Sequence, residues 1–153
     1  MAFGVIEFTG VPAGTDTASL GTDGSITYAN NFSGSGTGTA GSIDITTGTV
    51  GQTVEVFCDA TASMTDAGGI NPVTVDQIEV VSETTGGQAP GGGSACVNVT
   101  TASTTMVLTA PAGAGDQFFF GGRIVGNATL TAGDAYSTAN AAGDNVEIRV
   151  FYQ

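Results

Sequence analysis

The stretch from Val146 to Tyr152 has the sequence Val-Glu-Ile-Arg-Val-Phe-Tyr and alternates without interruption between two kinds of side chain. Apolar and aromatic residues occupy every second position: Val146, Ile148, Val150 and Tyr152. Successive strand residues point to opposite faces of a sheet, so these four would share one face. Glu147, Arg149 and Phe151 would face the other side. The stretch predicts a half-buried β-strand near the C-terminal end.

The same period of two recurs along the chain, and a helical period is almost absent. Further strands are predicted within nine ranges: 3–9, 24–29, 42–46, 51–59, 73–82, 96–100, 104–110, 117–125 and 128–131. Gly-rich stretches at 32–41 and 83–94 are expected to be loops, the second of them the most flexible part of the chain. Short strands with turn signals every 8–12 residues or so are typical of a β-sandwich or barrel. We therefore expect residues 1–153 to form one all-β domain.

The charge of the chain excludes two classes of partner. The chain has fourteen acidic residues and two basic residues, Arg123 and Arg149, so its net charge is −12. Nucleic acids and anionic membrane surfaces are bound by clustered Lys and Arg, so neither is expected to be a partner. No stretch approaches the roughly 20 apolar residues of a membrane span. We interpret the acidity as a source of solubility and mutual repulsion; the alternatives are divalent-cation binding or life in saline water.

Cys58 and Cys96 are the only cysteines, and the chain has no His. A structural zinc site needs four Cys or His ligands, which excludes one here. In a Gly- and Thr-rich β protein, two cysteines favour one disulfide formed in an oxidising compartment. The alternative is a pair of buried free thiols. Residues 1–4 show neither a basic region nor a continuous apolar stretch of a signal peptide, so if the protein is exported, we expect this sequence to be that of the mature chain.

The composition also excludes most catalytic chemistry. Without His or Lys, the commonest general bases, the Schiff-base route and the Ser-His-Asp triad are missing. The acids leave a carboxylate-based hydrolase as a remote alternative, although the chain has no Trp to line a sugar cleft. We predict that the protein is not an enzyme, that it has no catalytic residue and no cofactor, and that its acids lie dispersed on solvent-exposed faces.

Two short motifs recur. Ala-Gly-Asp occurs three times, ending at Asp116, Asp134 and Asp144. We interpret these as turns in which Gly supplies positive φ. The alternative is a calcium loop, but such loops concentrate several carboxylates and each of these holds one, so no metal site is predicted. Asn-x-Ser/Thr triplets begin at Asn31, Asn98 and Asn127; in a Thr-rich chain these arise often by chance, so they carry little weight for glycosylation.

Several segments together resemble a known group of proteins: Phe3-Gly4-x-Ile6, the Gly- and Thr-rich middle, Gly126-Asn127-Ala128-Thr129-Leu130 and Val150-Phe151-Tyr152-Gln153. They resemble uncharacterised bacterial secreted β-domains, which are similar to spore-coat-U-like proteins and chaperone–usher pilins. The resemblance implies an immunoglobulin-like, pilin-like antiparallel β-sandwich that lacks one strand. It also implies export through the periplasm to the cell surface, identical subunits as partners, and a periplasmic chaperone and an outer-membrane usher.

On this resemblance, residues 1–14 form a donor strand with its connector, because Met1–Thr9 carries apolar residues on both faces. The alternative is a first strand that pairs within its own subunit. The predicted subunit interface comprises Phe3, Val5, Ile6, Phe8, Val146, Ile148, Val150 and Tyr152. The expected function is that of a structural subunit of an extracellular filament or surface coat, held non-covalently because no Lys is present for crosslinks. The alternative is a monomeric adhesive or glycan-binding β-sandwich module.

Overall fold

The computed structural model describes residues 1–35, 37–110 and 116–153, and every regular element in them is a β-strand. All pairings between these strands are antiparallel. The strands are β1 (Val5–Phe8), β2 (Thr17–Leu20), β3 (Ile26–Ala29), β4 (Phe32–Ser35), β5 (Gly41–Asp44), β6 (Thr53–Cys58), β7 (Ala62–Met64), β8 (Val73–Ser82), β9 (Ser94–Ala95), β10 (Thr104–Val107), β11 (Gln117–Val125) and β12 (Ile148–Tyr152). The described residues contain no helix long and apolar enough to cross a membrane.

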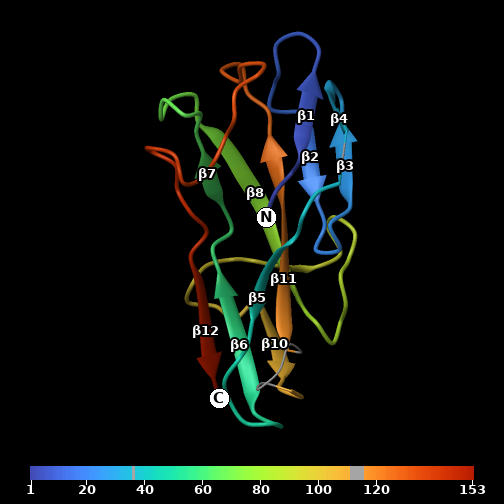
Figure 1. Ribbon diagram of the computed structural model, residues 1–153, viewed down its shortest axis with the longest axis vertical. Coiled ribbons are helices and arrows are strands. Elements are labelled where there is room, and N and C mark those ends of the chain that lie inside the picture. Colours follow the sequence, from blue (N-terminus) through green and yellow to red (C-terminus); the bar gives the residue numbers. More distant parts are fainter. Residues whose placement is uncertain (36, 111–115) are drawn as a thin grey trace.

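The long strands β8 and β11 form the centre of the main sheet, whose order is β3-β2-β11-β8-β7. One edge of β11 is shared, because β5 pairs with its first half and β2 with its second half. A second sheet has the order β10-β6-β12, and β1 and β4 form a separate pair. In Figure 1 the second sheet lies over the lower half of β8 and β11, whereas β1 and β4 lie at the upper end. The protein is therefore all-β and resembles a β-sandwich in its layering.

The core lies between the two larger sheets. Val54, Val56 and Cys58 of β6 are fully buried, as their alternation in the sequence predicts. They belong to one apolar cluster with residues of the main sheet, including Phe118 and Phe120. β12 pairs with β6 in a register that sets Val150 opposite Val56. Its burial alternates over Ile148 to Phe151, so the half-buried strand predicted near the C-terminal end is confirmed.

A β-bulge in β8 explains why the sequence of this strand does not alternate evenly. Asp76 pairs with Arg123 and Glu79 with Gly121, so two residues of β8 lie opposite Gly122 alone. Gln77, one of the two, has a φ of 46°. Val73 and Val75 face the core before the bulge, and Ile78 and Val80 do so after it. The extra residue of a bulge reverses which alternate positions face the core. Both halves of β8 therefore direct apolar side chains toward the core.

Three of the predicted loop and strand segments are wrong in the described residues. The expected loop at 32–41 contains strand β4, which pairs with β1 along its whole length. Its Gly34 lies so close to the Tyr28 hydroxyl and the Val5 carbonyl that a Cβ would collide with both. The expected strands at 96–100 and 128–131 are instead turns, because the side-chain oxygens of Asn98 and Asn127 accept backbone N–H groups two residues further on.

The Gly-rich stretch 83–94 folds back over the outside of the main sheet. Gln88 N donates to Thr22 Oγ1 at 2.8 Å, and Asp23 N donates to the Gln88 carbonyl at 3.0 Å. The stretch then enters β9, which pairs with β8. It is a surface loop, as predicted, but these hydrogen bonds attach it to the turn after β2.

Candidate functional site

An apolar groove with a volume of about 1140 Å³ opens at the upper half of the main sheet. Its floor is the inner face of that sheet, formed by Val73 and Val75 of β8 and by Phe120 and Ile124 of β11. One wall is the N-terminal segment with β1. The other wall consists of β7, the 130–138 segment and the residues that lead into β12. The inner face of the main sheet is thus not fully covered by the second layer.

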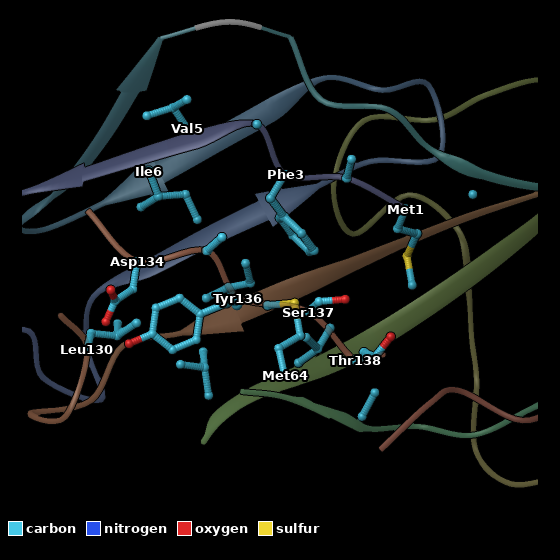
Figure 2. Close-up of a pocket in the computed structure, with 18 of the residues that line it drawn as sticks. Met1, Phe3, Val5, Ile6, Met64, Leu130, Asp134, Tyr136, Ser137 and Thr138 are labelled. Atoms are coloured by element: carbon cyan, nitrogen blue, oxygen red, sulfur yellow. The ribbon is translucent and has the colours of Figure 1, made fainter. Parts of the chain in front are cut away.

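The N-terminal wall points its apolar side chains into the groove. Figure 2 shows Phe3 and Ile6 directed toward Met64 and Tyr136 on the opposite wall, and Val5 directed away from them. Residues three apart fall on opposite sides of a regular strand, but Gly4 lies between them with a φ of +69°. This kink brings both side chains to the groove side. Val5 remains 59% exposed.

The opposite wall is held in place by polar contacts of its own. The Tyr136 hydroxyl accepts the backbone N–H of Thr131 at 3.0 Å, which closes the 131–136 turn. Thr65 and Ser137 exchange two backbone hydrogen bonds, of 3.1 and 3.0 Å, which attach this segment to the end of β7. Leu130 and the Tyr136 ring pack against the core from this side. This wall is therefore fixed to the main sheet, whereas β1 of the N-terminal wall pairs, among the described strands, only with β4.

Two strands next to the groove have a partner on one side only within the described residues. β1 pairs with β4 alone, and β12 pairs with β6 alone. The N–H and C=O groups on the other side of such strands are open to pairing with a further strand. Residues of β1 and the first residue of β12, Ile148, line the groove. The site thus combines an apolar floor with strand edges that have unused pairing capacity.

The structure brings together most, but not all, of the predicted interface residues. Those that line the groove are Phe3, Val5 through its backbone, Ile6, Phe8, Val146 and Ile148. Val150 packs against the core instead. Tyr152 lies at the end of β12, 43% exposed, and its hydroxyl is 2.8 Å from Thr47 Oγ1. Met64, Leu130 and Tyr136 also line the groove, although nothing in their local sequence pattern connects them to the N-terminal strand.

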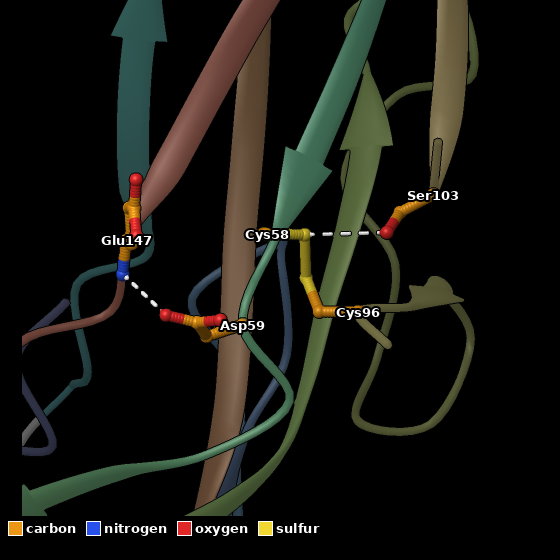
Figure 3. The surroundings of a disulfide bond; sticks show 5 residues. All are labelled: Cys58, Asp59, Cys96, Ser103 and Glu147. Atoms are coloured by element: carbon orange, nitrogen blue, oxygen red, sulfur yellow. Dashed lines mark hydrogen bonds between the residues drawn. A yellow bond between two sulfur atoms is a disulfide. The ribbon is translucent and has the colours of Figure 1, made fainter. Parts of the chain in front are cut away.

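The predicted disulfide is confirmed: Cys58 and Cys96 are bonded, with Cα atoms 5.1 Å apart (Figure 3). Cys58 ends β6 of the second sheet. Cys96 follows β9, and its N–H donates to the Ile78 carbonyl of β8 at 2.8 Å. The Ser103 hydroxyl lies 3.5 Å from Cys58 Sγ. The bond therefore links the second sheet to the main sheet, and the alternative of two free thiols is excluded.

The prediction that the acids lie dispersed on solvent-exposed faces is wrong for four of them: Asp16, Asp66, Glu79 and Asp116 are buried. Each accepts hydrogen bonds from backbone N–H groups of a nearby loop. Asp66 accepts those of Gly68 and Ile70, both at 3.0 Å. Glu79 accepts those of Gly91 and Gly93, at 3.2 and 2.9 Å. These carboxylates fix loops, since a buried acceptor must be paired with donors.

The hydrogen bonds at Asp16 and Asp116 lower the pKa of both carboxyls. At Asp16 the largest cause is the N–H of Ala13, which donates at 2.8 Å, followed by the N–H of Asn31 at 3.1 Å. At Asp116, burial raises the pKa, but the N–H groups of Thr109 and Ala110 and the Thr109 hydroxyl together outweigh it. Both groups are held as carboxylates, because their donors favour the charged form.

The two described Ala-Gly-Asp tripeptides are turns. Gly133 has a φ of +90°, as the turn interpretation expects, whereas in the other it is Ala142 that has a positive φ, of 60°. In the third tripeptide, residues 114 and 115 lie outside the described residues, and its Asp116 is one of the buried loop-fixing acids. The described part of the chain holds no group of three or more Cys, Asp or Glu side chains placed to bind a metal ion.

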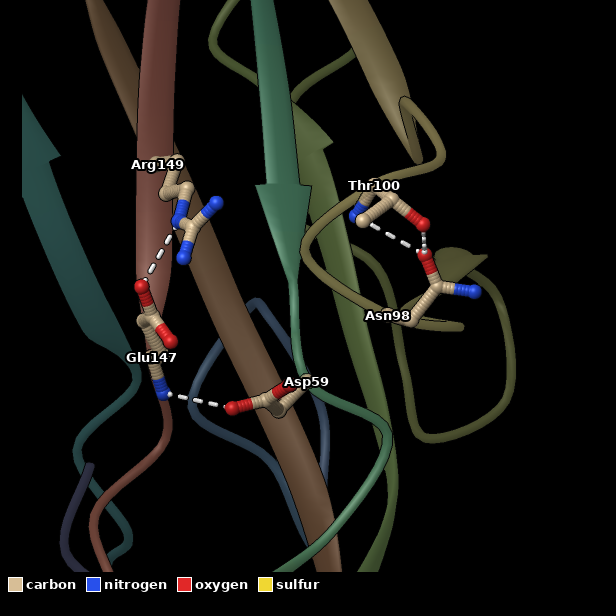
Figure 4. Close-up of polar contacts among 5 residues, drawn as sticks. All are labelled: Asp59, Asn98, Thr100, Glu147 and Arg149. Carbon is tan, nitrogen blue, oxygen red and sulfur yellow. Dashed lines mark hydrogen bonds and ion pairs between the residues drawn. The ribbon is translucent and has the colours of Figure 1, made fainter.

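Both arginines are engaged in ion pairs. Arg123 holds Asp76 through two hydrogen bonds of 2.8 and 2.7 Å, and Asp76 raises the pKa of the guanidinium. Arg149 Nε lies 2.6 Å from Glu147 Oε1 (Figure 4). Neither arginine lines the groove. Comparison of the chain with protein-family models, with curated proteins and with solved structures finds no match.

Proposed function

We propose that this protein is a structural subunit of a non-covalent extracellular filament or surface coat, assembled by strand complementation on a pilin-like, immunoglobulin-like sandwich. The observation that carries the proposal is the apolar groove, whose floor is the part of the main sheet that the second layer leaves uncovered and beside which lies the singly paired strand β12. Strand addition to such an edge is an established mode of protein association. At about 1140 Å³ the groove also exceeds the roughly 300–1,000 Å³ of small-molecule pockets.

The N-terminal strand of a second copy is the proposed occupant. Within its own chain β1 buries Ile6 and Phe8 in part, yet it pairs with a single strand and leaves Val5 exposed. Apolar residues on both faces suit a strand that is covered on both faces. The 9–14 stretch that follows contains Gly10, with a φ of +81°, and Pro12, and serves as the connector at which the chain leaves its own body.

An interface in which the strand of one subunit enters the groove of the next is head to tail. A head-to-tail interface whose rotation does not close a ring generates a filament, and the proposal requires this open geometry. The disulfide supports assembly in an oxidising compartment, and export through the periplasm with a chaperone and an usher belongs to this proposal. Identical subunits are then the principal partners.

The test is electron microscopy of the purified full chain and of a variant that lacks residues 1–9. We expect filaments from the full chain and soluble, non-polymerising subunits from the deletion, with assembly restored by a Met1–Thr9 peptide. Two point variants test whether loss of filaments is specific to the groove. Ile6→Asp places a charge in the groove and should abolish filaments, whereas Val107→Asp alters an exposed residue of β10, 52% accessible, and should not.

A deletion variant that still forms normal filaments would exclude residues 1–9 as the donor. A full chain that remains monomeric at every concentration tested would contradict the filament itself. Circular dichroism of each variant shows whether the subunit is still folded, so that loss of assembly is not confused with loss of structure.

A further inference from the structure

The three Asn-x-Ser/Thr triplets differ in what their asparagine amide nitrogens contact. Asn31 Nδ2 donates to the buried Asp16 carboxylate at 3.4 Å, and its backbone N–H donates to the same carboxylate. Asn127 Nδ2 donates to the Pro72 carbonyl at 2.5 Å. Asn98 is half-buried, its Nδ2 has no hydrogen-bond partner among the described residues, and in Figure 4 this nitrogen points away from Thr100. Only one of the three triplets therefore presents a free amide nitrogen.

The comparison between Asn98 and Asn127 is close, because both triplets form the same turn. Asn98 Oδ1 accepts the Thr100 N–H at 2.8 Å and the Thr100 hydroxyl at 2.6 Å. Asn127 Oδ1 accepts the corresponding groups of Thr129 at 2.9 and 2.6 Å. The two sites share the same turn and differ in the partner of Nδ2. The unpaired amide nitrogen is therefore the feature that distinguishes Asn98 from Asn127.

We propose that Asn98 is an N-glycosylation site that accepts a sugar from a glycosyl pyrophosphate donor, linked either to a lipid or to a nucleoside. In the transfer, Asn98 Nδ2 forms a bond to C1 of the sugar while the bond between C1 and the phosphate oxygen breaks. The pyrophosphate leaves with its carrier, and the proton lost from Nδ2 passes to a base of the transferase. The Thr100 hydroxyl, which donates to Oδ1, stabilises the charge that develops on that oxygen as the proton leaves.

The surroundings of Asn98 suit an enzyme that must approach it in the folded protein. Thr100 and Val97 are exposed on either side, Val97 to 56%. Cys96, two residues before Asn98, is fixed to β6 by the disulfide and to β8 by its N–H, so the turn is presented on a rigid base. No residue of 96–103 lines the groove. A glycan at Asn98 therefore leaves the groove free, and the inference does not depend on the filament.

The test is peptide mapping by mass spectrometry of the full chain recovered from the cells that produce it. We expect a sugar on the peptide that contains Asn98 and none on the peptides with Asn31 or Asn127. Asn98→Gln and Thr100→Val should each remove the whole sugar mass, whereas Thr100→Ser keeps the triplet and should retain it. Asn127→Gln and Thr129→Val, which alter the matched turn, should change nothing.

Two results overturn the assignment: an unmodified Asn98 in the native protein, or a sugar that persists in Asn98→Gln. Incubation of the folded, disulfide-bonded chain with a transferase for lipid-linked donors, and separately with one for nucleotide-linked donors, identifies the donor. Circular dichroism confirms that the variants fold, so loss of the sugar reports on the acceptor site.

Discussion

Replacement of both cysteines, Cys58→Ala and Cys96→Ala together, should destabilise the protein by a predictable amount. The bond closes a sequence separation of 38 residues. In the chain-entropy treatment, such a loop removes about 13 cal/mol/K from the unfolded ensemble, or about 4 kcal/mol at 25 °C. Cys58 is fully buried and Cys96 nearly so, which adds a smaller packing loss to this figure. A loss of this size is a large part of the ~5–15 kcal/mol that stabilises a typical domain.

Equilibrium urea unfolding of the wild type and the double variant measures the loss. If the disulfide acts on the unfolded chain, its removal lets that chain expand, so the m-value should rise while the midpoint falls. Wild-type protein unfolded under reducing conditions is the control for the packing loss, because its sulfur atoms remain. A loss below about 1 kcal/mol, with an unchanged m-value, would refute the entropic argument.

Two other outcomes follow from buried groups. The pKa of Asp16 and of Asp116 is lowered from 3.8 in the folded protein, so their stabilising contribution is fully present well above 3.8 and is lost as the pH falls from that value through the lower pKa of the folded state. The urea concentration at the unfolding midpoint should stay constant from about pH 7 to about pH 5 and decrease below about pH 4. The decrease should be less steep in Asp116→Asn. A midpoint that stays constant down to about pH 2 would contradict this prediction. Gly34→Ala should cost about 1–3 kcal/mol, because its Cβ collides with Tyr28. Gly14→Ala, which has open space, should shift stability by less than about 1 kcal/mol, and thermal unfolding of the pair measures the difference.

Strands whose pattern is local could be predicted from the sequence. β6 and β12 lie within their predicted ranges because alternate residues face one core, and β11 has its predicted bounds. β8 also has its predicted bounds, but the phase of its side chains depends on the bulge at Gln77, which is set by pairing with β11. β2, with the sequence Thr-Ala-Ser-Leu, was missed. It lies between β3 and β11, where small residues are buried by neighbours that the sequence alone does not reveal.

The same distinction holds for the candidate site. The apolar residues of the N-terminal strand and of the 146–148 segment could be identified because each follows its own strand pattern. The opposite wall could not, because Met64, Leu130 and Tyr136 come from segments that meet only in the folded chain. The buried acids were missed for a related reason. Asp116 accepts donors seven residues away and Asp16 accepts the N–H of Asn31, and neither spacing distinguishes a buried carboxylate from an exposed one.

The distribution of charge bears on how the proposed subunits would associate. Each copy carries a net charge of −12, and both arginines pair with acids of their own chain. Neighbouring subunits therefore repel one another, and attraction between opposite charges does not account for assembly. The groove instead supplies apolar side chains, among them Phe3 and Tyr136, and strand edges that have no partner among the described residues. Burial of those side chains and main-chain pairing must then exceed the repulsion, which is why the proposed interface lies in the groove and not on the acidic surface.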